Sequence, residues 1–362
     1  MSDISGRKAD HMRLATAPEA TPGGGAGFAD VQLLHRALPE VDHEALDPGA
    51  EILGRRFELP LVVASMTGGH AAGGEVNAVL ARVAERRGLP MGVGSQRAAL
   101  RDPGLADSYA IARRVAPSAF LMANVGAPQL VRQGGTPGLT SAEVRDLADM
   151  IRADALIVHL NPIQELAQPE GDRSAAGWLD AIARLVADLP IPVVAKETGG
   201  GVSEAVAREL AAAGVAAIDV GGRGGTNFAA IEGLRAEEHG NERAAALASA
   251  LSRWGIPTAV SIALAARAGL PTIGTGGIRT GIDAAAAINL GAHAVGVARP
   301  LLEAALAGGE AAVELWIDRF RDELLAAMFL TGSASLDDLR RVPRIVTGET
   351  ARWLDALGAS TG

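Results

Sequence analysis

Eight short apolar segments recur along the chain, and each ends in small or polar residues. Continuous runs of Val, Ile, Leu and Ala of this length are typical of strands that are buried on both faces of a parallel sheet. Stretches rich in Ala, Leu, Arg and Glu, which favour helix, separate most of them. The predicted strands are Leu61–Met66, Met91–Gly94, Phe120–Asn124, Ala155–Leu160, Pro192–Lys196, Ala217–Val220, Thr272–Thr275 and Ala294–Ala298.

The number of these units predicts an α/β fold, a closed (β/α)8 TIM barrel. An open doubly wound sheet is the less favoured alternative, because eight such units follow an N-terminal extension. The clearest helices are expected at Glu75–Arg87, Ser203–Ala213 and Gly281–Leu290. The run Thr258–Ile262 is expected to begin a helix rather than form a ninth strand, since a proline precedes it and alanines follow it.

The remaining segments divide the chain further. Residues 1–58 are expected to form an N-terminal arm and lead-in, residues 59–309 the barrel, and residues 310–362 C-terminal helices packed on its outside. The first 27 residues begin polar and end in a glycine-rich run, which is typical of a mobile arm and linker. The longest departure from the repeat is the insertion at 233–253.

Composition excludes several classes of protein. The formal net charge of -9 and the absence of a large basic patch argue against a nucleic-acid-binding protein, as does an aromatic content of 3%. The chain has no cysteine, which excludes disulfides, thiol catalysis and cysteine-bound metals. No signal peptide and no membrane-spanning apolar run is visible, so we expect a cytoplasmic protein without a membrane partner.

Lysine is almost absent from the chain. Of 33 basic residues only Lys8 and Lys196 are lysines. A lysine is a compact point donor, whereas arginine is a broad planar fork, so a lysine that persists in such a chain is a candidate for a specific site. Chance retention on the surface is the plain alternative for either residue alone.

The fourth predicted strand ends in an unusual density of polar side chains. His159, Asn161, Gln164 and Glu165 follow its apolar residues, and the segment 168–173 continues with Gln, Glu, Asp and Arg. In a barrel the C-terminal ends of all strands meet on one face, where active sites lie. We therefore expect ligand contacts here, although His159 alone would more often be a satisfied core histidine and Glu165 a solvated carboxylate.

The last two strands lead into loops suited to a phosphate group. Residues 274–281 are rich in glycine, and Gly296 to Pro300 end the eighth strand; the loops after strands seven and eight are the usual phosphate site of a barrel. Glycine lets backbone N–H groups approach an anion closely. Lys196, which ends the fifth strand, is interpreted as a Schiff-base lysine or as a holder of negative charge on a cofactor ring, with an ion pair to Glu197 as the structural alternative.

Taken together, the motifs resemble one family. The segments Arg7–His11, Met66–Gly69, Gly94–Arg97, Asn124–Gly126, His159–Glu165, 168–173, Lys196–Glu197, Gly224–Thr226, Trp254–Thr258 and Gly276–Arg279 are similar, in this order, to those of type 2 isopentenyl-diphosphate isomerase. The resemblance runs from residue 7 to about residue 300, and the His-Leu-Asn-Pro-x-Gln-Glu run is its most specific part.

The resemblance implies an FMN-dependent isomerase of isoprenoid biosynthesis that interconverts isopentenyl diphosphate and dimethylallyl diphosphate. It also implies reduced FMN, Mg²⁺, NADPH as reductant, and a homo-oligomer, either a tetramer or an octamer. The implied FMN contacts are Met66, Thr67, Gly68, Ser95, Asn124, Lys196 and Thr226, with Gly276, Gly277, Ala298 and Arg299 at the phosphate. The implied substrate contacts are Arg7, Lys8, Ser95, Gln96, Arg97, His159, Asn161 and Gln164, with Glu165 as the metal ligand.

The chemistry agrees with this expectation. Moving a double bond requires a proton on one carbon and the loss of another from its neighbour, and a reduced flavin beside the alkene is our hypothesis for both transfers. Gln164, His159 and Lys196 are the side chains expected to assist. The chain departs from the family pattern at Thr198, at Gly221–Gly224 and at Ala284–Ala287.

Two rival functions stay open at this point. An FMN-dependent 2-hydroxy-acid oxidase or dehydrogenase would share the lysine and the phosphate loops, but needs a histidine base late in the barrel, and His239 and His293 lack a comparable motif. A non-catalytic flavin-binding protein would need neither Arg7 and Lys8 nor Glu165.

Overall fold

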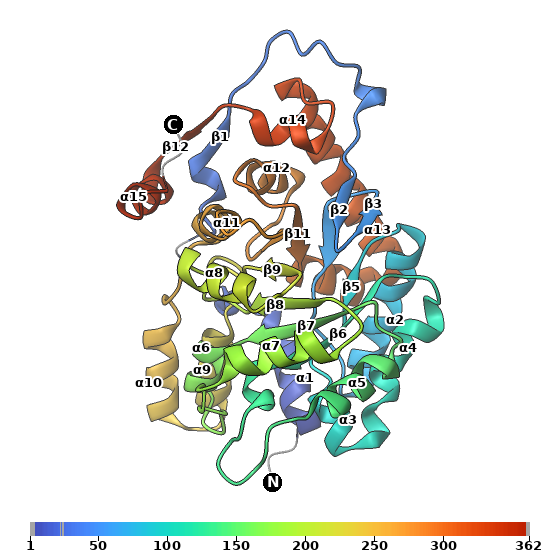
Figure 1. Ribbon diagram of the computed structural model, residues 1–362, viewed down its shortest axis with the longest axis vertical. Helices are drawn as coiled ribbons and strands as arrows, with labels where there is room; N and C mark the ends of the chain where they lie inside the picture. Colours follow the sequence, from blue (N-terminus) through green and yellow to red (C-terminus); the bar gives the residue numbers. More distant parts are fainter. Residues whose placement is uncertain (1–3, 22, 24, 360–362) are drawn as a thin grey trace.

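The computed structural model of the protein describes residues 4–21, 23 and 25–359. Its centre is a closed barrel of eight parallel strands, which confirms the predicted fold class (Figure 1). Each strand overlaps one of the predicted segments. The strands are β4 (Leu61–Val63), β5 (Met91–Gly92), β6 (Leu121–Gly126), β7 (Ala155–Leu160), β8 (Val193–Glu197), β9 (Ala217–Asp219), β10 (Thr272–Thr275) and β11 (Ala294–Val297).

The barrel closes where the last strand pairs with the first. In the register of β11 and β4, Val295 lies opposite Leu61. The central pair β7–β8 aligns His159 with Lys196, and the next pair aligns Lys196 with Asp219. Parallel register therefore places three polar side chains side by side at the same end of the barrel.

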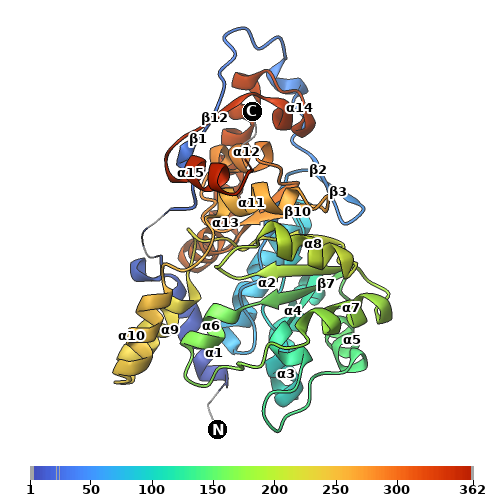
Figure 2. The same ribbon diagram turned by 60° about the vertical axis from the view of Figure 1, so that its left-hand side comes forward.

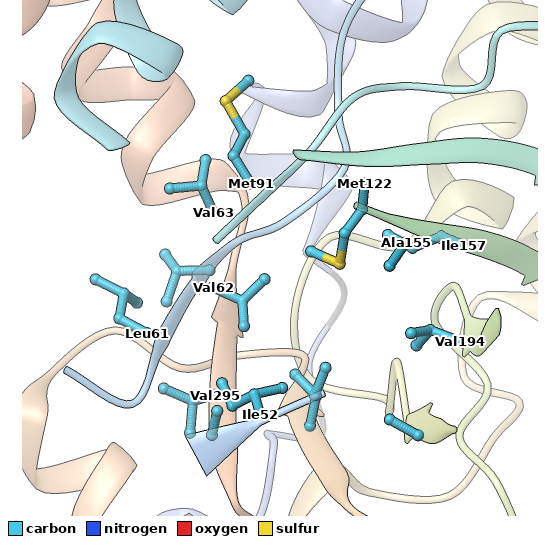
Figure 3. Packing of buried hydrophobic residues seen from close by; sticks show 14 of the residues in the cluster. Ile52, Leu61, Val62, Val63, Met91, Met122, Ala155, Ile157, Val194 and Val295 are labelled. Atoms are coloured by element: carbon cyan, nitrogen blue, oxygen red, sulfur yellow. The ribbon is translucent and has the colours of Figure 1, made fainter. Parts of the chain in front are cut away.

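Buried apolar side chains pack on both faces of the barrel wall (Figure 3). Met91, Met122, Val194 and Val295 are each at most 2% exposed. An antiparallel hairpin of β2 (Ala50–Ile52) and β3 (Arg55–Phe57) adds Ile52 to this cluster beside β4 and β11 (Figure 3). The hairpin thus closes the N-terminal end of the barrel, and the opposite end is left to the polar residues.

Helices surround the barrel in chain order. The predicted helix at Thr258 is confirmed as α11, and the insertion before it is a pair of helices, α9 and α10. The helices are α2 (Ala71–Arg86), α3 (Arg97–Arg101), α4 (Asp107–Val115), α5 (Ser141–Met150), α6 (Pro162–Ala167), α7 (Trp178–Asp188), α8 (Glu204–Ala212), α9 (Phe228–Glu238), α10 (Glu242–Leu251), α11 (Thr258–Ala266), α12 (Gly281–Asn289) and α13 (Arg299–Thr331).

The N-terminal arm contains a helix that the sequence analysis did not predict, α1 (Ile4–Ala15). Helix α1 lies against α9, and both views place it beside α9 and α6 (Figures 1 and 2). His11 Nε2 lies 2.8 Å from Glu232 Oε1, and the Arg13 guanidinium lies 2.7 Å from Glu238. Tertiary contacts to the inserted helix pair therefore hold α1 across the C-terminal end of the barrel.

The C-terminal segment packs on the outside of the barrel. Helix α13 is broken at Gly308 and Gly309, which have non-helical dihedral angles. After it come α14 (Leu336–Arg341), β12 (Arg344–Val346) and α15 (Gly348–Ala356). Strand β12 pairs with β1 (Val31–Leu33) of the lead-in, so the lead-in and the C-terminal segment form a small antiparallel sheet (Figure 2). Within the described ranges no helix is long and apolar enough to cross a membrane.

Candidate active site

A cavity opens at the C-terminal ends of the strands, beneath α1. Its larger chamber encloses about 1370 Å³ including its mouth, and a second chamber of about 710 Å³ adjoins it. Ser65, Lys196, Thr226, Ala298 and Arg299 line both chambers. Two connected spaces of this size are enough for a cofactor and a small substrate to lie side by side.

The structure brings together almost all residues expected at the site, although they come from segments far apart in the sequence. The larger chamber is lined by Arg7, Lys8, Met66, Thr67, Gly68, Ser95, Arg97, Asn124, His159, Asn161, Gln164, Glu165, Lys196, Thr226, Ala298 and Arg299, and the smaller one also by Gly276 and Gly277.

Gln96 is the exception. Its side chain has no exposed surface and does not line either chamber. Its Nε2 donates a hydrogen bond to the carbonyl of Leu147 at 2.7 Å, and its Oε1 accepts one from the Asn124 N–H at 3.0 Å. Both ends of the amide are therefore engaged behind the wall, away from the chamber in which the substrate contact of Gln96 was expected. Gln96 instead supports Asn124.

Lys8 stands in an unusual environment on the underside of α1. Its Nζ donates to the carbonyl of Ser95 at 2.6 Å and to the hydroxyl of Tyr109. Burial, together with Arg7 and Arg97, lowers the pKa of Lys8 to about 7. Burial in turn raises the pKa of Tyr109. Without an anion in the cavity, this lysine is poised to gain or lose its proton near neutral pH.

His159 is held in its neutral form. Its Nδ1 lies 2.8 Å from Asn124 Oδ1, while Asn124 Nδ2 donates to the carbonyl of Val93. Because that second bond fixes the amide, we assign the ring proton to Nδ1, which leaves the Nε2 lone pair free to accept. Burial and the cations Lys8, Lys196 and Arg97 lower the pKa of His159 to about 4.

Glu165 presents a buried carboxylate at the start of α6. Its Oε1 accepts from Asn161 Nδ2 at 2.8 Å, and its Oε2 accepts from the Asp172 N–H at 2.6 Å. Burial raises the pKa of Glu165 despite these two bonds. Asn161 is 3% exposed and its Oδ1 has no partner among the described residues. The wall thus offers a carboxylate and an unsatisfied amide oxygen to a ligand.

Lys196 forms an ion pair with Asp219 and not with Glu197. Lys196 Nζ lies 2.8 Å from Asp219 Oδ2, which also accepts from Thr275 Oγ1 at 3.0 Å. The Glu197 side chain accepts backbone N–H groups of its own loop instead, and burial raises the pKa of Glu197 to about 7. A paired ammonium is a poor Schiff-base nucleophile, so the arrangement favours a fixed positive charge at the floor of the cavity.

Sequence reasoning missed the role of Asp219. The aspartate ends the sixth predicted strand, and parallel register with the fifth strand sets it beside Lys196. The expected register of these two neighbouring strands could therefore have predicted that Asp219 lies beside Lys196. Tyr109 carried no comparable signal, since it reaches Lys8 from a helix.

The smaller chamber has the form of a phosphate cradle. The N–H groups of Gly276, Gly277 and Ile278 have no hydrogen-bond partner among the described residues. Gly276 has a φ of 120°, and a Cβ there would lie 2.3 Å from the carbonyl oxygen of Gly222. The N-terminus of α13 also borders the chamber and has no side-chain cap, whereas Thr280 and Asp283 close the N-terminus of α12. Free N–H groups and an uncapped helix N-terminus together suit a bound phosphate.

Comparison with known proteins identifies the family. The chain is 48% identical over 353 residues to the isopentenyl-diphosphate delta-isomerase of Methanoregula boonei, covering 97% of this chain and 96% of that protein. It is 42% identical to that of Methanothermobacter thermautotrophicus over 360 residues, covering 99% and 98%. This chain belongs to the isopentenyl-diphosphate delta-isomerase family. The family model for FMN-dependent dehydrogenase also matches residues 18–102 and 131–345.

Solved structures show the fold that this isomerase family shares with flavin oxidases. A mandelate oxidase with 2-hydroxy-phenylacetamide superposes with a TM-score of 0.62 at 20% identity, covering 94% of this chain and 98% of the other. A lactate oxidase of Pediococcus acidilactici gives 0.64 at 16% identity, covering 95% and 93%. Neither late-barrel histidine lines the cavity here. His239 ends α9, and His293 accepts from the Thr272 N–H at the opposite end of the barrel.

The residues present fit FMN, and they fit a metal ion that the protein and a bound ligand hold together. The cradle suits the FMN phosphate, and Lys196 suits an electron-rich ring next to it. The described ranges hold no group of three metal-ligating side chains of the His, Cys, Asp and Glu type. Glu165 with the free Asn161 oxygen fits Mg²⁺ only when a ligand contributes further oxygens, as phosphates do.

Proposed function

We propose that this protein interconverts isopentenyl diphosphate and dimethylallyl diphosphate, using FMN in its reduced form, as a step of isoprenoid biosynthesis. One observation carries the proposal. A cationic cluster of Arg7, Lys8 and Arg97 and the carboxylate of Glu165 share one chamber, and this chamber opens onto a separate phosphate cradle. A protein that binds only flavin needs one anion site, whereas this cavity offers two.

The cationic cluster would hold the substrate. Arg97 and Arg7 provide planar donor groups that suit phosphate oxygens, and Lys8 gains its full charge when an anion arrives. Glu165 would bind Mg²⁺ together with the diphosphate, and Asn161 Oδ1 would accept from its hydration shell. The apolar end of the substrate is then directed inward, toward Lys196.

The remaining polar groups would manage protons around the alkene. When bound, reduced FMN supplies an electron-rich ring that carries an exchangeable proton and stabilises developing positive charge. Lys196, which is itself held by Asp219, would supply a fixed positive charge to that ring. His159, neutral with a free Nε2, can accept a hydrogen bond from substrate, and Gln164 can orient a proton or a water.

Further properties belong to the same proposal. We propose NADPH as the reductant that keeps the flavin reduced, Mg²⁺ as the metal, a cytoplasmic location, and a homo-oligomer of four or eight subunits. Family resemblance supports these assignments.

The test is isomerisation by the purified protein. Protein reconstituted with FMN, reduced, and supplied with MgCl₂ is expected to convert either diphosphate into the other without consuming stoichiometric NADPH. Full activity with oxidised flavin and a chelator, or failure to take up FMN, would refute the proposal. Oxidation of lactate or mandelate by the same preparation would instead support the oxidase alternative.

A further inference from the structure

The loop after α6, residues 168–173, carries polar side chains to which the proposed chemistry gives no role. Its backbone is fixed against α6. A Cβ on Gly171 would lie 1.9 Å from the carbonyl oxygen of Glu165, so the close approach requires glycine. The guanidinium of Arg173 donates to the carbonyls of Glu165 at 3.4 Å and Gln168 at 3.3 Å, at the C-terminal end of α6. The loop is therefore a rigid extension of the helix that carries Glu165.

Asp172 of this loop contacts two residues of the cavity wall. Its Oδ2 lies 2.5 Å from Arg97 Nη1, and its backbone N–H donates to Glu165 Oε2 at 2.6 Å. Gln129 Nε2 donates to the same Oδ2 at 3.4 Å. Asp172 does not itself line the cavity. It stands behind Arg97 and Glu165 and connects the cation of the diphosphate site with the carboxylate of the metal site.

We infer that Asp172 is the positioning residue of the diphosphate site. This inference rests on the proposed function. Arg97 Nε and Nη2 have no partner among the described residues and remain available for phosphate oxygens, while Asp172 holds Nη1. An arginine anchored in this way loses less side-chain freedom when a ligand binds. The aspartate also offsets the repulsion between Arg97 and the nearby cations Arg7 and Lys8.

A second contact of the same loop follows this pattern. Glu170 lies 3.7 Å from Arg7 Nη1 and 2.8 Å from Arg235 Nη1. Two carboxylates of one loop thus hold two arginines of the cationic cluster, one from α1 and one from α3. The loop orders both cations before the diphosphate arrives.

A double-mutant cycle on Asp172 and Arg97 tests the inference. The FMN-loaded enzyme is titrated with isopentenyl diphosphate and MgCl₂ by calorimetry, and KM and kcat are measured in parallel. Asp172→Ala is expected to weaken binding and raise KM about tenfold, the size of one charge-assisted hydrogen bond, with kcat changed less than about twofold. In the Arg97→Ala background, Asp172→Ala should change binding less than about twofold, because its target is gone.

Controls separate positioning from folding. Asp172→Asn keeps the size of the side chain and the N–H to Glu165, so it measures the charge even if the alanine variant is unstable, and we expect part of the tenfold loss. Asp337→Ala removes the partner of Arg340 on α14, outside the cavity lining, and should leave binding unchanged.

The outcomes are distinct. Independent effects of Asp172→Ala and Arg97→Ala, or a fall in kcat at unchanged KM, would overturn the inference and leave the proposed function standing. A wild-type enzyme that binds no diphosphate would overturn the proposed function itself.

Discussion

The low pKa of Lys8 predicts that substrate binding takes up a proton. In the free enzyme the pKa of Lys8 is about 7, lowered by burial and by Arg7 and Arg97. The other titratable groups that face Lys8 are Tyr109, His70 and His159. A bound diphosphate stabilises the charged ammonium. Well below pH 7 Lys8 already carries its proton, so binding takes up none there, whereas well above pH 7 binding must add a proton to Lys8.

The magnitude follows from this linkage. Above the pKa, apparent affinity falls roughly tenfold for each pH unit, so from pH 6 to pH 9 the contribution of Lys8 reaches roughly 100-fold, or about 2.7 kcal/mol. Lys8→Arg replaces the lysine with a guanidinium that stays charged throughout this range and should remove the dependence. The ionisation of the diphosphate affects both proteins equally, so the ratio of their dissociation constants isolates Lys8.

Calorimetric titration with isopentenyl diphosphate and MgCl₂ provides the assay. Titrations in two buffers of different ionisation enthalpy report the number of protons taken up on binding. We expect Lys8 to contribute roughly half a proton per bound diphosphate at pH 7 and about 0.9 at pH 8. Proton uptake by Lys8→Arg should be lower than that of the wild type by these amounts. Identical pH profiles for the two proteins would refute the reasoning, as would equal proton uptake.

Three further predictions concern the cofactor, the metal and the core. Lys196→Ala should weaken FMN retention at least about tenfold, read from flavin fluorescence, because Asp219 is left as an unpaired buried charge; retention equal to wild type would contradict this. Glu165→Gln should raise the MgCl₂ concentration needed for half-maximal activity at least about tenfold, and an unchanged titration would remove Glu165 from the metal site. Met122→Ala should lower the free energy of unfolding by about 2–5 kcal/mol in denaturant titrations, because Met122 is 2% exposed in the barrel core, and a loss below about 1 kcal/mol would mean that the core collapses around the gap.

The barrel itself could be predicted from the sequence because most of its strands are short apolar runs of characteristic length. All eight were found, with ends that differ by a few residues. The first expected strand continues to Met66, for example, whereas the ladder of β4 ends at Val63. Beyond that point the chain turns toward the cavity, which apolar pattern alone does not indicate.

Other features depend on tertiary contacts and could not be predicted from the sequence. Helix α1 begins in a polar segment, and its ion pairs with α9 become visible only once the inserted helices are placed. Gln96 occupies the expected loop, but its amide finds better partners behind the wall, and sequence position does not reveal which way a side chain turns. The position of Asp172 in the sequence likewise does not reveal its partners, Arg97 at a separation of 75 residues and Glu165 at a separation of seven.

The placement of α1 divides recognition between two parts of the chain. The cradle and Lys196 belong to the barrel, whereas Arg7 and Lys8 belong to a helix ahead of it. Arg299 joins the two parts, because its guanidinium donates to Thr16 and Thr21 just beyond α1. A chain shortened to begin at Gly25 would therefore lose the roof of the cavity with both diphosphate cations of α1, and would leave Arg299 without its contacts to Thr16 and Thr21.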